Sequence, residues 1–200
     1  MSETNQTPAP AAAPQERRRI HARRTAISTY ARPDGLWDIE GELLDTRGYE
    51  YRDPQLAMKA AEDPVHDMTL RLTVDRTLTI REAGAIMDAT PFAECPSAGF
   101  PVAKLAGVRI GAGFRKQVEE VMGGVRGCTH LRDLVFQMGT AAMLAIPHYI
   151  KSVEGDTTKI DTGEPNPYGY MGQCMTWDFD GPLIARVAPR FAGWKPLKRS

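Results

Sequence analysis

Apolar and polar residues alternate along the chain from Ile20 to about Ile80, a pattern that predicts strands separated by turns. The clearest segment is DMTLRLTVD, residues 67–75, whose four apolar side chains share one face. LWDIEGELLD, residues 36–45, alternates in the same way and places Asp38 and Glu40 opposite its apolar set. A strand-like segment lies on either side of these two, RTAISTYAR before and TLTIREAGAIMDA after. Together the four segments predict an antiparallel meander.

The hydrophobic period changes after Pro91. GFRKQVEEVM, residues 113–122, carries apolar residues at helical spacing and is followed by two glycines. THLRDLVFQMGTAAMLAIP, residues 129–147, is a longer helical pattern, with Thr129 as its predicted N-cap and Pro147 as its predicted stop. Strands followed by helices predict an α+β fold. We therefore expect the antiparallel β-meander of the N-terminal half to pack against two or more helices from the C-terminal half.

The 200 residues predict one α+β domain over residues 17–200, preceded by a disordered leader over residues 1–16. The leader is rich in Pro and Ala and has no basic start followed by an apolar stretch, so it is not expected to be a signal peptide. Residues 151–175 are rich in Gly, Pro, Thr and Asp and predict a long loop. Whether this loop acts as a lid is left open.

Composition narrows the possible functions. The 25 Lys and Arg balance 25 Asp and Glu, and without a basic excess we expect no nucleic-acid partner. The longest apolar runs, such as 141–146, are far shorter than a membrane span, so we expect no membrane partner. Three cysteines are an odd number and form no disulfide framework, which favours a cytoplasmic protein.

The balanced charge is unevenly distributed along the chain. Five arginines fall within residues 17–24, and six carboxylates fall within residues 34–50. The arginines fit a solvated segment or a charged strand edge, and the alternative is a contact for a substrate anion. We expect the two groups of opposite charge to meet on the sheet.

Common cofactor motifs are missing from the sequence. It contains no GxGxxG, GxxxxGK[ST], GxSxG, HExxH or CxxC, so we expect no cofactor. A metal site built from Cys95, Cys128, Cys174 and either His66 or His130 has separations of 33 and 46 residues between its cysteines, which match no compact ligand pattern. The sequence therefore predicts no metal.

Two histidines are the leading catalytic candidates, because imidazole titrates near neutral pH. By strand parity His66 lies on the apolar face, where a hydrogen-bonded core histidine is the alternative to a catalyst. His130 follows Cys128 at the start of the long helix, where the positive helix end favours anions and lowers the pKa of a thiol. A purely structural cysteine and capping histidine remain equally open. The predicted catalytic set is His66, His130, Asp67, Arg71, Glu40, Asp38 and Tyr30, and Asp45 is a further carboxylate in the same segment as Asp38 and Glu40.

The sequence resembles the bacterial domain-of-unknown-function family 2889. The resemblance rests on DGLWDIEG at 34–41, VHDM at 65–68 and GCTHL at 127–131, in that order, and it extends over about residues 20–190. It implies a small cytoplasmic bacterial protein associated with catabolism of aromatic and other hydrophobic compounds. It implies no established activity.

These observations favour a cofactor-independent acid/base enzyme that acts on a small aromatic or hydrophobic hydroxylated compound. A lyase of retro-aldol or dehydratase type is the leading hypothesis, with a histidine or carboxylate as base and Arg71 or the amides of 129–130 holding negative charge. One alternative is a (thio)ester hydrolase with Cys128 as nucleophile. Another is a non-catalytic metal-binding or assembly module. A homodimer is expected in each case.

Overall fold

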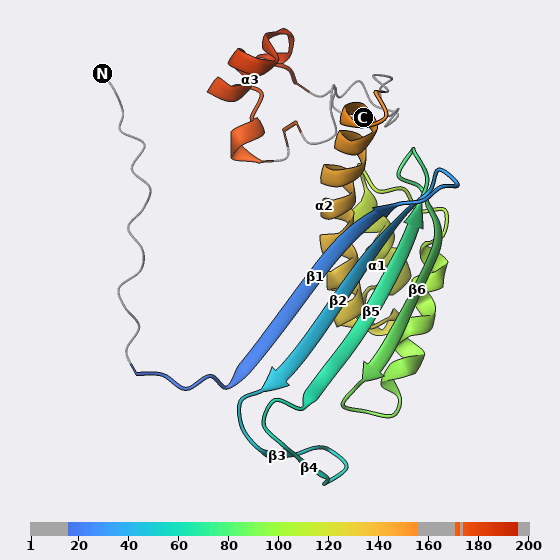
Figure 1. Cartoon of the computed structure of the whole chain (residues 1–200), viewed down its shortest axis with the longest axis vertical. Coiled ribbons are helices and arrows are strands. Elements are labelled where there is room, and N and C mark those ends of the chain that lie inside the picture. The colour runs from blue at the N-terminus through green and yellow to red at the C-terminus, as the bar shows by residue number, and fades with distance from the viewer. Residues whose placement is uncertain (1–15, 156–170, 173, 196–200) are drawn as a thin grey trace.

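A computed structural model describes residues 16–155, 171–172 and 174–195. Its centre is a four-stranded antiparallel sheet in the order β1-β2-β5-β6 (Figure 1). The strands are β1 (His21–Ala31), β2 (Trp37–Arg47), β5 (Pro64–Val74) and β6 (Ile80–Ala89). All four coincide with the alternating segments of the sequence, so the predicted meander is confirmed.

A short hairpin interrupts the meander between β2 and β5. It consists of β3 (Tyr51–Arg52) and β4 (Met58–Lys59) and extends beyond one end of the main sheet (Figure 1). The sequence pattern did not predict it, because two-residue strands are too short to show alternation.

Helices from the C-terminal half cover one face of the sheet, so the predicted α+β class is confirmed (Figure 1). They are the 3₁₀ segment η1 (Cys95–Leu105), α1 (Phe114–Met122), the short η2 (Gly124–Arg126) and the long α2 (Thr129–Ser152). The chain then forms η3 (Met175–Trp177), α3 (Pro182–Val187) and η4 (Pro189–Phe191), where the rings of Phe179 and Trp194 pack 4.9 Å apart. We call the helix-covered face of the sheet the inner face and the opposite one the outer face.

The core lies between the inner face and α2. Alternate side chains of β2 and β5, such as Ile39 and Leu72, are fully buried, as are α2 residues at helical spacing, such as Leu134 and Met138. Gly41 allows the close approach of α2, since a Cβ at this position would lie 2.8 Å from Met138 Sδ and 3.1 Å from the Leu134 side chain. The absence of a side chain at Gly41 therefore allows α2 to pack close to the sheet.

The long helix differs from its prediction at both ends. Cys128 rather than Thr129 is the N-cap residue, and α2 continues past Pro147 to Ser152. An interior proline removes one helical hydrogen bond and costs about 3 kcal/mol. The helix tolerates this cost because Ile146 and Ile150, on either side of the proline, are both buried in the core.

Two predicted segments lie outside the described residues: the leader, apart from Glu16, and most of the predicted 151–175 loop. Lys151 and Ser152 of that loop belong to the end of α2. Within the described part of the chain, no helix is both long and apolar enough to cross a bilayer.

The packing at Gly41 predicts a large effect of a small substitution. Gly41→Val should destabilise the fold by about 1–3 kcal/mol, because the added side chain overlaps α2 in a filled core. Gly84→Val is the matched control, since a Cβ on Gly84 of β6 meets nothing within 4 Å. Urea unfolding followed by circular dichroism measures both. Equal stability of the two variants would contradict the close approach of α2 to β2.

Candidate functional site

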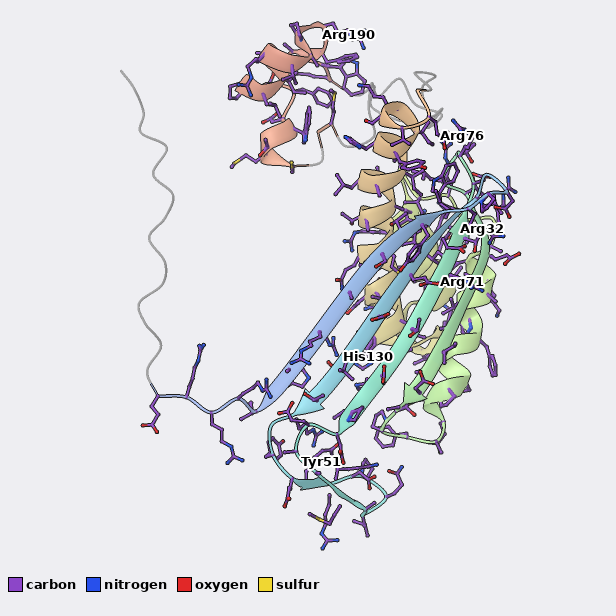
Figure 2. The ribbon with its side chains drawn as sticks, viewed as in Figure 1. Arg32, Tyr51, Arg71, Arg76, His130 and Arg190 are labelled. Carbon is purple, nitrogen blue, oxygen red and sulfur yellow. The ribbon has the colours of Figure 1, made fainter. Side chains whose placement is uncertain are left out.

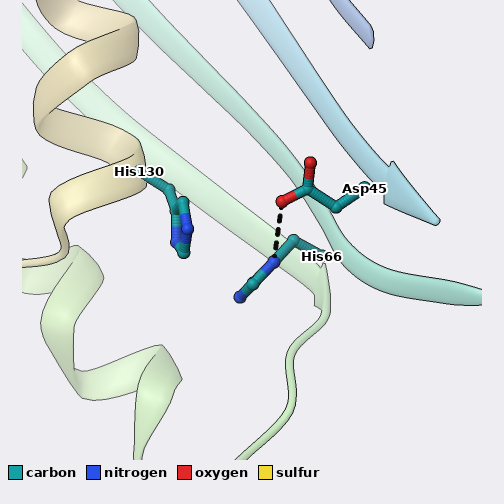
Figure 3. Close-up of side chains that lie close together, drawn as sticks. All are labelled: Asp45, His66 and His130. Atoms are coloured by element: carbon teal, nitrogen blue, oxygen red, sulfur yellow. Dashed lines mark hydrogen bonds and ion pairs between the residues drawn. The ribbon is translucent and has the colours of Figure 1, made fainter. Parts of the chain in front are cut away.

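Three polar side chains meet at one end of the inner face of the sheet. Asp45 comes from β2, His66 from β5 and His130 from the first turn of α2 (Figure 3). Asp45 and His66 are direct cross-strand partners, which brings their side chains to the same face. His130 reaches them from the helix layer, at the end of the sheet nearer the β3–β4 hairpin (Figure 2). We call these three residues the Asp45 cluster.

Asp45 is only 2% exposed, and its carboxylate is held by charged partners. Arg23 of β1 binds it with both arms of its guanidinium, Nε to Oδ1 at 2.7 Å and Nη2 to Oδ2 at 2.6 Å. The Nε2 atom of His21 lies 3.4 Å from Oδ1. Burial by itself would raise the pKa of the Asp45 carboxyl, but hydrogen bonds and charge from Arg23 and then His66 hold it below its ordinary value. Asp45 is therefore an anion at neutral pH.

The ionised Asp45 determines the orientation and tautomer of His66. Nδ1 of His66 lies 3.0 Å from Oδ2 of Asp45. An ionised carboxylate only accepts hydrogen bonds, so Nδ1 carries the ring proton and donates a hydrogen bond to Oδ2 of Asp45. In the neutral ring, Nε2 of His66 is then left with a free lone pair. This arrangement suits a general base or a metal ligand.

His130 packs against His66, with ring centroids 4.1 Å apart and ring planes at 47°. Its pKa is lowered, first by burial and then by the electrostatic effect of the neighbouring His66 and Arg23. His130 is therefore neutral at pH 7 and offers one N–H donor and one lone pair. Sγ of Cys128, the N-cap residue, lies 3.8 Å from Nδ1 of His130.

The structure separates the predicted catalytic residues into two groups. Only His66 and His130 join the Asp45 cluster, because strand parity places the rest of the set on the outer face. Asp38 there accepts hydrogen bonds from Thr73 at 2.6 Å and Arg32 at 3.4 Å. Arg71 lines a small hollow and lies farther along the sheet from His130 (Figure 2). The other outer-face members are Tyr30, Glu40 and Asp67.

Two residues outside the predicted set complete the site, Asp45 and Arg23. Asp45 has the same parity as Ile39 and Leu43, so the alternation of β2 already placed this carboxylate on the apolar face. Arg23 belongs to the arginine run, for which a solvated segment or an anion contact was expected. Of the two groups of opposite charge, Arg23 and Asp45 form an ion pair across β1 and β2.

The pKa of Asp45 predicts how stability depends on pH. The carboxyl binds a proton less readily in the folded chain than in the unfolded one, so its stabilising contribution is complete above about pH 5 and is lost as the pH falls through and below 3.8. Asp45→Asn should therefore lose about 1–3 kcal/mol at pH 7 and show a smaller deficit at pH 3. Urea unfolding at pH 7, 5 and 3 measures the difference, with the exposed Asp88→Asn as control. A deficit that does not vary with pH would contradict the assignment.

The comparisons with known proteins identify a family but no activity. No curated protein and no solved structure matches the chain. Residues 21–144 match the model of a family described as "Protein of unknown function (DUF2889)". This span runs from the start of β1 into α2 and contains Arg23 and the whole Asp45 cluster. The chain therefore belongs to the DUF2889 family.

Proposed function

We propose that this protein is an acid/base enzyme with the Asp45 cluster as its catalytic centre, acting as a lyase on a small hydrophobic or aromatic hydroxylated compound. The observation that carries the proposal is the 3.0 Å contact between Asp45 and His66, which leaves Nε2 of His66 available as a base. His130 beside it is a neutral donor, so a base and a donor lie next to each other.

The proposed reaction is a retro-aldol cleavage, written here for a β-hydroxy carbonyl compound. Nε2 of His66 takes the hydroxyl proton as the oxygen forms a C=O bond and the adjacent C–C bond breaks. The electron pair of that bond moves into the second carbonyl group as an enolate. His66 then returns its proton to the enolate carbon, so no oxidant or reductant is needed. Asp45 stabilises the positive His66 between the two proton transfers.

The developing enolate needs positive charge or hydrogen-bond donors near the cluster. Arg71 is on the outer face and does not supply them. The backbone N–H groups in the first turn of α2 have no acceptor within the helix. The dipole of this 24-residue helix adds partial positive charge at the same end. His130 lies in this turn, so a substrate oxygen bound beside it meets these groups.

Exposed apolar side chains at the same end of the sheet support a hydrophobic substrate. Leu56 and Met58 lie in the β3–β4 hairpin, and Phe92 and Phe100 lie in the segment after β6. A hydrogen bond from Gln55 Nε2 to the Pro91 carbonyl at 3.3 Å joins these two segments. Apolar groups exposed together favour binding of an apolar surface.

The cytoplasm is the compartment that we propose for this enzyme. All three cysteines, Cys95, Cys128 and Cys174, are free thiols in the structure. Unpaired cysteines are typical of proteins kept in a reducing environment.

Substitution of the two histidines tests the proposed reaction. Protein treated with a chelator is incubated with a panel of hydroxylated aromatic carbonyl compounds, and cleavage products are measured by mass spectrometry. His66→Ala and His130→Ala should each lower turnover by about 10²–10⁴-fold, because each removes a proton-transfer or donor group. His148→Gln is the matched control, since His148 is exposed on the same helix as His130, far from the cluster.

Two further variants separate this proposal from its rivals. Cys128→Ser should retain turnover, and its inactivity would instead assign the chemistry to a thiol nucleophile. Loss of turnover in Arg71→Gln with full activity of His66→Ala would move the active site to the outer face and overturn the proposal.

A further inference from the structure

We propose that the Asp45 cluster is also a binding site for a divalent transition-metal ion such as Zn²⁺. Each of its three residues offers one ligand atom, and these atoms all lie within 4.8 Å of one another. In a tetrahedral zinc site the bonds are about 2.0–2.1 Å long, which places neighbouring ligand atoms about 3.4 Å apart. Metal binding would draw the three ligand atoms together over the remaining difference by side-chain rotation.

The chemistry of the donors selects the class of ion. Two imidazoles and one carboxylate suit zinc and other first-row transition metals, whereas calcium and magnesium prefer sites made only of oxygen. Three protein ligands leave a position for water or substrate, as in catalytic rather than structural zinc sites.

Burial and rigid support distinguish this cluster from a chance group of surface side chains. Asp45 is 2% exposed, and the side chain of His66 is 14% exposed. The three ligands come from two paired strands and from a helix anchored in the core, so little side-chain freedom is lost when a metal binds. The half-exposed His130 leaves an entry path from solvent.

Arg23 is the group that opposes a cation at this site. It uses one lone pair on each oxygen of Asp45, and His66 uses the second one on Oδ2, so Oδ1 keeps a lone pair for a metal. The Arg23 side chain is 39% exposed, so it can also turn toward solvent as the ion enters. On the same side, His21 lies 3.4 Å from Asp45 and is a candidate for a further ligand.

Metal binding at this site would regulate the proposed reaction. An ion on His66 takes up a lone pair that the base needs, so Zn²⁺ should inhibit turnover. This regulatory consequence rests on the proposed function, whereas binding itself is measured without any substrate.

Calorimetric titration with ZnCl₂ tests the site in the full chain, prepared without a histidine tag and stripped with a chelator. We expect one equivalent to bind. His66→Ala and His130→Ala should each weaken affinity by at least about tenfold, and His148→Gln should leave it unchanged. Circular dichroism verifies that each variant is folded, and His130→Gln replaces His130→Ala if the latter is not.

Cobalt gives a second measurement that does not depend on the variants. Co²⁺ bound to the parent chain should show visible ligand-field bands without a thiolate charge-transfer band. Absence of stoichiometric Zn²⁺ binding, equal affinity of the parent and both histidine variants, or a thiolate band would overturn the metal site and leave the proposed function standing. Metal binding together with activity that disappears on chelation would support the metal site. It would overturn the proposed reaction, in which His66 acts as a base without a metal.

Discussion

The buried charge of Asp45 is the constraint on which this end of the molecule depends. A carboxylate removed from water costs several kcal/mol unless charged and hydrogen-bonded partners compensate for it. Arg23 on one neighbouring strand and His66 on the other are those partners. The contacts of Asp45 with Arg23 and His66 therefore join β1, β2 and β5 at this end of the sheet. The contact with His66 also fixes the orientation of its ring.

Most of the fold could be predicted because its signals are local. The alternation of β2 and β5 and the helical period of α2 are visible within single segments of the sequence. The stop predicted at Pro147 was wrong for a tertiary reason. Whether a helix continues past a proline depends on what the next turn buries, and burial by a distant sheet leaves no mark on the local sequence.

The site was less predictable because it depends on pairing between strands. Parity correctly placed His66 on the apolar face and placed Asp38 and Glu40 on the opposite one. It could not show that Asp45 pairs with His66, because parity gives the face of the sheet on which a residue lies and not its partner on the next strand. Nor could it show that the first turn of α2 lies over this pair, which depends on the packing of α2 against Gly41 and its neighbours.

The β3–β4 hairpin connects β2 to β5 just beyond the Asp45 cluster. One further pair, Thr46 with Pro64, lies between the cluster and the hairpin, after a register shift between Asp45 and Thr46. Changes in hairpin length or composition can then alter the apolar surface beside the cluster without displacing the side chains of the cluster. This arrangement separates the part of the molecule that would choose a substrate from the part that would react with it, so the two can diverge independently.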